Sequence, residues 1–255
     1  MSWSSVSYSK WSAGGNTTLF FRTSLEKGAW VREALGTHGL CAEQAGFIDP
    51  TIYTLAMAGG EFCLNAARSF GAYLAWDMGE ENTTIIVSGW PEPVNITCLG
   101  KAPLWHVRAR LPLPPISLTE LEPGIIKVAL PGITHLLLDD THILPHSDIV
   151  TVHAQMRKHF GLEEEACVGL VWWEQTRAGC AITPLVYVRD TQTTVWEQAC
   201  GSGSLACALG LGLDACTIRQ PSGANLDVQL AQDRSWAAVS GEVLLIAEGK
   251  YWMSF

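Results

Sequence analysis

The chain has 255 residues, 48% of them apolar (AVILMFWYC) and 16% charged, and its 25 acidic residues against 16 lysines and arginines give a net charge of −9. This composition excludes a disordered chain and lacks the basic footprint of a nucleic-acid-binding protein. No apolar run reaches about 18 residues, so no membrane span is expected, and segment 1–16 lacks the basic start and apolar stretch of a signal peptide.

Segments with alternating or β-branched residues predict a chain built mainly of strands. In chain order these segments are 17–21, 53–57, 84–87, 94–97, 105–111, 125–130, 134–138, 168–173, 185–188, 193–196, 217–219, 226–230, 236–239 and 243–247. Two amphipathic helices are expected at 29–38 and 147–160. Segments 63–75 and 202–213 are rich in Ala, Leu and Gly, with Arg68 as their single charged residue. A helix that is apolar on nearly every side is expected to be buried in the protein core, so both segments predict central helices.

The Pro-rich segment 111–116 (LPLPPI) predicts a linker between two halves of similar size. Each half has the same order of strand, cysteine, apolar helix, strand, Ser-Gly and strand. Gly89 follows Cys63 by 26 residues, and Gly223 follows Cys200 by 23 residues. This shared order predicts a pseudo-repeat. The alternative is a chance similarity between two helices rich in Ala and Gly.

Eight cysteines are present, without a C-x-x-C pair or the spacing of a zinc module, and most are expected to be small buried residues. Cys63 and Cys200 differ because each stands where a strand turns into an apolar helix. The N–H groups and the dipole at a helix start are expected to lower a thiol pKa and to bind a carboxylate. Two such helix starts facing each other predict a carboxylate cradle with a sulfur on either side. That arrangement suits the transfer of a proton from one face of a carbon to the other.

Other motifs give weaker signals. Segment 201–203 (GSG) alone is a weak phosphate-binding pattern, and the sequence contains no P-loop, G-x-G-x-x-G or G-x-S-x-G. His142 and His146 are disfavoured as metal ligands because Pro145 interrupts a helix between them. A single nucleophilic cysteine, as in a cysteine hydrolase, would need a histidine partner that neither cysteine motif contains.

The motifs C-x-N-x-A-R (63–68) and A-C-G-S-G (199–203) resemble the two signatures of the diaminopimelate epimerase family of cofactor-independent amino-acid racemases. Other stretches are similar to one branch of that family, the histidine racemases of staphylopine-type metallophore synthesis. These stretches follow the expected order along the chain: 8–18, 41–49, 57–66, 87–90, 184–188, 195–203, 220–223 and 248–252.

The resemblance implies an α/β (α+β) fold of two pseudo-symmetric domains, each a barrel-like β-sheet around a central helix. It places the N-terminal domain at 1–112 plus 242–255 and the C-terminal domain at 113–241. The active site is expected in the cleft between them. One cysteine of the site comes from each domain, Cys63 from the first and Cys200 from the second.

The resemblance also implies the roles of individual residues. Cys63 and Cys200 would be the two catalytic acid/bases, with no pyridoxal phosphate, no other cofactor and no metal. The residues expected to bind a free amino acid are Asn16, Glu43, Gln44, Leu64, Asn65, Glu197, Gly201 and Ser202.

Within this set, the resemblance implies that the substrate carboxylate is bound by Asn65 and by the backbone of Gly201 and Ser202. It implies that Glu197 binds the substrate amino group. Without the resemblance, Asn16 is equally typical of a turn, and segment 43–44 of a solvated surface.

The function predicted in this way is inversion of an α-carbon, with conversion of L-histidine to D-histidine for an opine-type metallophore as the leading hypothesis. Segment 189–200 departs from the E-R-G-x-G-E-T of diaminopimelate epimerases and lacks its Arg clamp, and Leu64 replaces the usual Gly after the first cysteine. The alternatives are a racemase of another amino acid, diaminopimelate included, and a non-catalytic amino-acid-binding relative. Reactive thiols predict a reducing, cytoplasmic compartment. No nucleic-acid or membrane partner is expected, and the family allows a homodimer.

Overall fold

The computed structural model describes residues 3–23, 28–139, 141–142, 144 and 148–254. These residues form the helices α1 (Ala29–Leu35), α2 (Leu64–Asp77), α3 (Ile149–His159) and α4 (Gly201–Gly210). They also form the strands β1 (Trp3–Ala13), β2 (Asn16–Phe21), β3 (Gln44–Asp49), β4 (Thr54–Met57), β5 (Asn82–Val87), β6 (Val94–Lys101), β7 (Leu104–Pro112), β8 (Ser117–Glu122), β9 (Ile125–Leu130), β10 (Ile133–Leu138), β11 (Cys167–Gln175), β12 (Gly179–Val188), β13 (Thr193–Trp196), β14 (Ala215–Arg219), β15 (Asn225–Leu230) and β16 (Trp236–Ser254). No described helix has both the length and the apolar character needed to cross a membrane.

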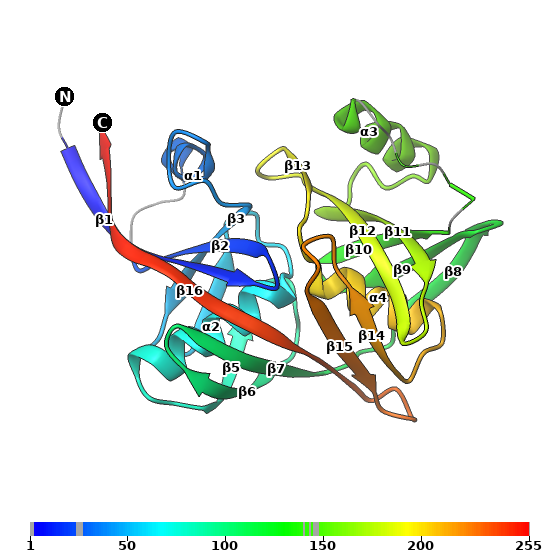
Figure 1. The fold of residues 1–255 in the computed structure, drawn as a ribbon. Coiled ribbons are helices and arrows are strands. Elements are labelled where there is room, and N and C mark those ends of the chain that lie inside the picture. The colour runs from blue at the N-terminus through cyan, green and yellow to red at the C-terminus, as the bar shows by residue number, and fades with distance from the viewer. Residues whose placement is uncertain (1–2, 24–27, 140, 143, 145–147, 255) are drawn as a thin grey trace.

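The first half of the chain forms a closed ring of strands around a helix. The strands follow the order β1-β2-β3-β4-β5-β6-β7-β16, and β16 pairs with β1 to close the ring. Helix α2 lies inside (Figure 1) and contacts β1, β2, β5, β6, β7 and β16. It is buried continuously from Leu64 to Leu74. This position explains why the segment is apolar on every side.

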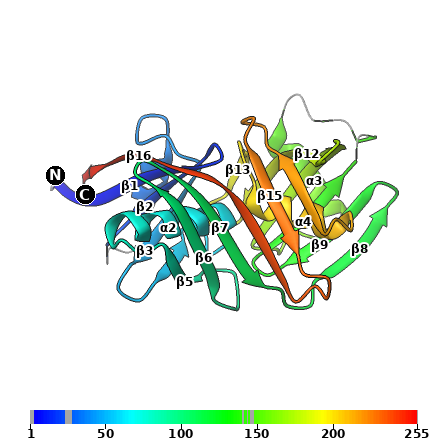
Figure 2. The ribbon, with the colours of Figure 1, turned by 60° about the horizontal axis from the view of Figure 1, so that its bottom comes forward.

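The second half repeats this plan with a curved sheet. Its strands follow the order β16-β15-β14-β12-β11-β10-β9-β8, and β13 pairs with β12. Helix α4 is buried from Gly201 to Leu209 and packs against β9, β10 and β15, among others. Both apolar segments are therefore central helices, one in each half (Figure 2).

Strand directions confirm the pseudo-repeat. In the first half, β2 is parallel to β3 across α1, and β4 is parallel to β5 across α2. In the second half, β10 is parallel to β11 across α3, and β12 is parallel to β14 across α4. Because parallel neighbours need a crossover connection, the helices stand at matching places in the two halves.

Strand β16 belongs to both halves. It pairs with β15 over 237–240, with β7 over 236–244 and with β1 over 243–254. The expected return of the late strand to the first half is confirmed, whereas the predicted break between 236–239 and 243–247 is wrong. At Gly241 an added Cβ would lie 2.7 Å from the side chain of Leu226, so the missing side chain lets β16 pass close to β15. The exact domain boundaries stay a prediction.

Some elements differ from the sequence prediction. Strands β1, β3 and β8 were not predicted: serines mask the alternation of β1 (WSSVSYSKWSA), β3 (QAGFID) is short and contains a glycine, and β8 is exposed over most of its length. Helix α1 ends at Leu35, earlier than predicted, because Gly36 is its C-cap. The predicted linker is shorter, because β7 continues to Pro112 and β8 begins at Ser117. For the predicted helix at 147–160, residue 147 lies outside the described residues.

Candidate active site

The starts of α2 and α4 lie against each other where the two halves meet. Asn65 Nδ2 on α2 donates a hydrogen bond of 2.9 Å to the carbonyl oxygen of Ala199, directly before α4. A Cβ added at Gly201 would lie 2.9 Å from Asn65 Oδ1 and 3.1 Å from Leu64 Cβ. The positive ends of both helix dipoles therefore point toward the same region, the junction between the two halves.

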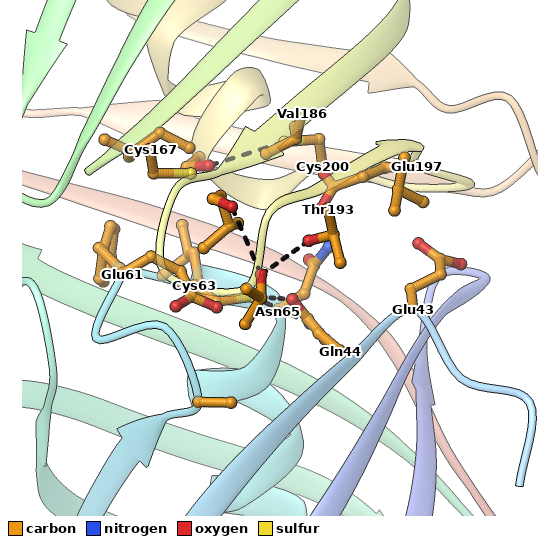
Figure 3. A pocket seen from close by; sticks show the side chains of 18 of the residues that line it. Glu43, Gln44, Glu61, Cys63, Asn65, Cys167, Val186, Thr193, Glu197 and Cys200 are labelled. Carbon is orange, nitrogen blue, oxygen red and sulfur yellow. Dashed lines mark hydrogen bonds between the residues drawn. The ribbon is translucent and has the colours of Figure 1, made fainter. Parts of the chain in front are cut away.

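A pocket opens at this junction and encloses about 660 Å³ of space, its open mouth included. Figure 3 shows its side chains, which come from both halves of the chain. The predicted site residues that line it are Glu43, Gln44, Cys63, Leu64, Asn65, Glu197, Cys200, Gly201 and Ser202. Asn16 is buried behind this lining, in contact with Glu43 and Gln44. The structure thus brings all ten predicted residues together, although their roles stay predictions.

The two cysteines occupy equivalent N-cap positions. Cys63 has φ −126° and ψ 105°, and Cys200 has φ −132° and ψ 105°. Cys63 Sγ accepts a hydrogen bond of 3.3 Å from the Ala66 N–H, and Cys200 Sγ accepts one of 3.3 Å from the Gly203 N–H. Each thiol thus fills the capping role that a serine or aspartate oxygen fills at other helices. All eight cysteines are free.

The predicted lowering of the thiol pKa values is wrong for the ligand-free pocket. Burial raises the pKa of Cys63 to about 12, and the nearby Glu197 carboxylate adds to this effect. Burial and Glu197 also raise the pKa of Cys200 well above its ordinary value. The N–H bonds at the helix starts act in the opposite direction, but loss of solvent around the thiolate outweighs them. Both thiols are neutral in the empty pocket.

Glu43 and Glu197 lie on the same side of the pocket (Figure 3). Burial raises the pKa of Glu43 to about 7, against the opposing hydrogen bond from Asn16. Burial, followed by the charge of Glu43, raises the pKa of Glu197 to about 8, and the Cys200 thiol donates a hydrogen bond to this carboxylate. A cation placed between the two carboxylates would lower both pKa values.

A chain of hydrogen bonds joins Glu43 to Cys63. Asn16 Nδ2 donates to Glu43 Oε2 at 2.8 Å, and Gln44 Nε2 donates to Asn16 Oδ1 at 2.7 Å. The Cys63 thiol donates to Gln44 Oε1 at 3.2 Å. These contacts show that segment 43–44 and Asn16 belong to the pocket wall and its support, not to a solvated surface or a simple turn. Cys63 is therefore oriented by an amide and Cys200 by a carboxylate.

Two supporting residues were not found from the sequence. His135 Nε2 lies 3.1 Å from Ser202 Oγ, and burial lowers the pKa of this imidazole to about 3, so it is neutral. Gln220 Oε1 accepts a hydrogen bond of 2.8 Å from the Cys200 N–H. His135 has no local signal, because it is 67 residues before Ser202. Gln220 lies in the QPSG stretch (220–223), and the similarity of this stretch to the histidine racemases was the only sequence signal that pointed to this residue.

Among the described residues, no group of three or more His, Cys, Asp and Glu side chains is arranged to hold a metal ion. His142 contacts Asp139 at 3.0 Å, and His146 lies outside the described residues. The expected absence of a metal and of a cofactor stays a prediction.

Residues 5–252 match a family model described as the histidine racemase CntK N-terminal domain. The chain belongs to this family. A histidine racemase of Fusobacterium nucleatum subsp. nucleatum is 28% identical over 237 residues, which cover 87% of this chain and 86% of the relative. A histidine racemase of Staphylococcus aureus (strain Mu50) is 23% identical over 273 residues, which cover 96% and 97%. The protein is an isomerase, an amino-acid racemase.

Solved structures share the fold of this racemase. A probable proline racemase from Agrobacterium radiobacter has a TM-score of 0.67 at 13% identity, covering 98% of this chain and 92% of its own. A hydroxyproline epimerase from Agrobacterium vitis has a TM-score of 0.65 at 11% identity, covering 98% and 93%. The predicted fold of two pseudo-symmetric barrel-like domains is confirmed.

Alkylation of the racemase by iodoacetamide is expected to accelerate steeply with pH. Because the pKa of Cys63 is about 12 in the empty pocket, its thiolate fraction rises about tenfold per pH unit between pH 7 and 10. Mass spectrometry of the peptide that contains Cys63 measures the rate, in a Cys41→Ala background that removes an exposed thiol. A rate that levels off below pH 9 would mean that the helix start, and not burial, sets the pKa.

Proposed function

We propose that this racemase interconverts L- and D-histidine without a cofactor, with Cys63 and Cys200 as the two acid/bases. One observation carries the proposal: two thiols that cap different helices line a single pocket, and the N-termini of both helices open into it. A carboxylate held at those N-termini would place its α-carbon between the sulfurs.

The helix starts supply the binding site for the carboxylate. The first N–H groups of an α-helix have no partner within the helix. Thiols take the N–H groups of Ala66 and Gly203, which leaves the N–H groups of four other residues nearest the pocket: Leu64, Asn65, Gly201 and Ser202. Negative charge grows on the carboxylate when the α-proton leaves, and N–H groups fixed at helix N-termini stabilise such a charge.

Proton transfer starts from Cys200, the thiol that is hydrogen-bonded to the Glu197 carboxylate. The substrate ammonium, lying beside Glu43 and Glu197, removes the repulsion that opposes a thiolate in the empty pocket. Glu197 then accepts the proton of Cys200, whose thiolate removes the α-proton from one face. The Cys63 thiol donates its own proton to the opposite face. Each turnover leaves the proton on the other sulfur, ready for the opposite enantiomer.

The charge of the pocket favours a substrate with a basic side chain. Glu43 and Glu197 line it, and its described lining includes no Arg, Lys or His. Arg189, in the segment where diaminopimelate epimerases carry their clamp, instead donates to the Glu164 carbonyl oxygen at the surface. The distal carboxylate of a substrate such as diaminopimelate would have no cationic side chain to pair with in this lining, whereas the imidazole of histidine would lie near acidic side chains. The proposal includes supply of D-histidine to opine-type metallophore synthesis, in the cytoplasm, as the resemblance implies.

Proton NMR of L-histidine with reduced enzyme in D₂O tests the proposal. The α-proton signal is expected to disappear while chiral chromatography shows a growing fraction of D-histidine, and neither change is expected with the Cys63→Ser/Cys200→Ser variant. Exchange with another amino acid but not with histidine would keep the two-thiol mechanism and reject the substrate. Tight binding of histidine without exchange would indicate a binding protein and reject the mechanism.

A further inference from the structure

A fully buried arginine, Arg68 of α2, lies behind the pocket wall. Its Nη2 donates a hydrogen bond of 2.8 Å to Asn65 Oδ1. Its Nε and Nη1 have no hydrogen-bond partner among the described residues, and no described carboxylate forms an ion pair with it. Burial lowers the pKa of this guanidinium to about 10, so it is still charged at neutral pH. Arginine is rarely buried in this way without a charged partner, and the exception calls for a reason.

The two halves of the chain differ at the position of this arginine. Arg68 follows Cys63 by five residues. Five residues after Cys200 stands Leu205, which is also fully buried. The matching place in the second half is therefore filled by an apolar side chain, which shows that the core of this fold does not need a cation there.

The position three residues before each cysteine shows the converse difference. Before Cys200 it is occupied by Glu197, and the Cys200 thiol donates a hydrogen bond to that carboxylate. Before Cys63 it is occupied by Gly60, which has no side chain to accept a proton. Cys200 therefore has a base beside it, whereas Cys63 has a cation further along the helix that it caps.

The surroundings of Cys63 oppose a thiolate. Burial and the charges of Glu197 and Glu61 raise the pKa of this thiol, against hydrogen bonds from the Ala66 N–H and the Gln44 amide. The proposed reaction nevertheless requires the thiolate, because Cys63 becomes negative when it gives its proton to the α-carbon. A further source of positive charge close to Cys63 would make this step easier.

We propose that the buried charge of Arg68 stabilises the Cys63 thiolate during racemisation, which makes Arg68 a positioning residue that acts through Cys63 and not on the substrate. The inference rests on the proposed role of Cys63 as an acid/base. A negative charge on Cys63 raises the pKa of Arg68. Because this attraction is mutual, the guanidinium favours formation of the thiolate by the same free energy.

The contacts of Arg68 hold its charge at the junction of the two halves. Asn65 accepts a hydrogen bond from Arg68 and donates one of 2.9 Å to the Ala199 carbonyl oxygen, directly before α4. A Cβ at Gly241 would lie 3.1 Å from Arg68 Nη1, so the glycine of β16 also leaves room for the guanidinium. Because this place is closed to solvent, salt screens the charge little.

Alkylation by iodoacetamide tests the inference in the Cys41→Ala background. At pH 8 the rate at Cys63 is expected to fall about tenfold in Arg68→Met, since loss of an opposite charge raises a thiol pKa by about one unit. Arg68→Lys keeps a cation and should recover at least about threefold of that loss. The Cys200 peptide of the same digest is the internal control. Arg177→Met, which removes an exposed cation, is the matched control and should leave the rate at Cys63 unchanged.

Stability and racemisation separate an effect of charge from a structural one. A buried cation without an ionic partner has lost its solvation, so Arg68→Met is expected to unfold at the same urea concentration as wild type or a higher one. Its kcat/KM for histidine should nevertheless fall about tenfold or more.

Three outcomes would overturn the inference: a neutral variant that does not fold, alkylation of Cys63 in Arg68→Met as fast as in wild type, or equal rates in Arg68→Met and Arg68→Lys. Circular dichroism establishes whether each variant is folded. Alkylation requires no turnover. A wild-type chain that does not racemise histidine would therefore reject the proposed function, while the alkylation rates would still decide whether Arg68 stabilises the Cys63 thiolate.

Discussion

Serine at position 63 or 200 is expected to lower the rate of racemisation by about a thousandfold or more, in line with the loss of a general acid/base. A hydroxyl has a far higher pKa than a thiol and does not take the α-proton at neutral pH. Serine is also a good N-cap, so the hydrogen bonds to Ala66 and Gly203 that begin the two helices are retained. The loss of activity should therefore occur in folded protein.

Chiral chromatography, started separately from each enantiomer, measures this loss. Because each thiol serves one face of the α-carbon, both single variants are expected to fail in both directions. Cys167→Ala is the matched control, since Cys167 lines the same pocket without capping a helix. Its activity should stay within a few-fold of wild type. Full two-way turnover by Cys63→Ser or Cys200→Ser would exclude the two-thiol mechanism.

Glu197→Gln is expected to lower activity and to raise stability at alkaline pH. Activity should fall by about a hundredfold or more, because glutamine neither pairs with the substrate ammonium nor accepts the Cys200 proton. The pKa of Glu197 rises on folding from 4.5 to about 8. Between these values the folded protein holds a proton that the unfolded chain has released, so stability falls as pH rises through this window.

Glutamine removes that dependence, so the variant should gain roughly 4–5 kcal/mol of unfolding free energy over wild type at pH 9, relative to the difference at pH 4. Urea unfolding at several pH values measures this difference. Glu92→Gln is the control, because Glu92 is exposed and its replacement should leave both activity and pH dependence unchanged. An equal pH dependence in wild type and Glu197→Gln would mean that Glu197 is ionised without cost in the empty pocket.

Local patterns were sufficient to predict the central elements of this racemase. Segments 63–75 and 202–213 contain almost no charge, and such helices have to be buried. Their positions after a strand and a cysteine then placed Cys63 and Cys200 at helix starts. The repeat of this order predicted two similar halves. Each inference used residues that are adjacent in sequence, because the spacing of apolar residues within one segment indicates both its secondary structure and its burial.

Features that depend on distant segments were not predictable in the same way. The thiol pKa values are set by burial and by Glu197, so a helix start considered alone gave the wrong direction. The contact of His135 with Ser202 depends on how β10 packs beside α4. Strand β1 was missed because serines contribute little to a hydrophobic pattern even when Val6 and Trp11 are buried.

The shared strand β16 has a consequence for synthesis of the chain on the ribosome. The first barrel closes only when residues 243–254 pair with β1, and the ribosome makes these residues after every other strand of that barrel. Until they emerge, β1 keeps an open edge, and an open strand edge is prone to pair with another chain. Loss of the last ten residues should therefore damage the N-terminal half more than the C-terminal half. Limited proteolysis of such a truncated chain would reveal which half is cut first.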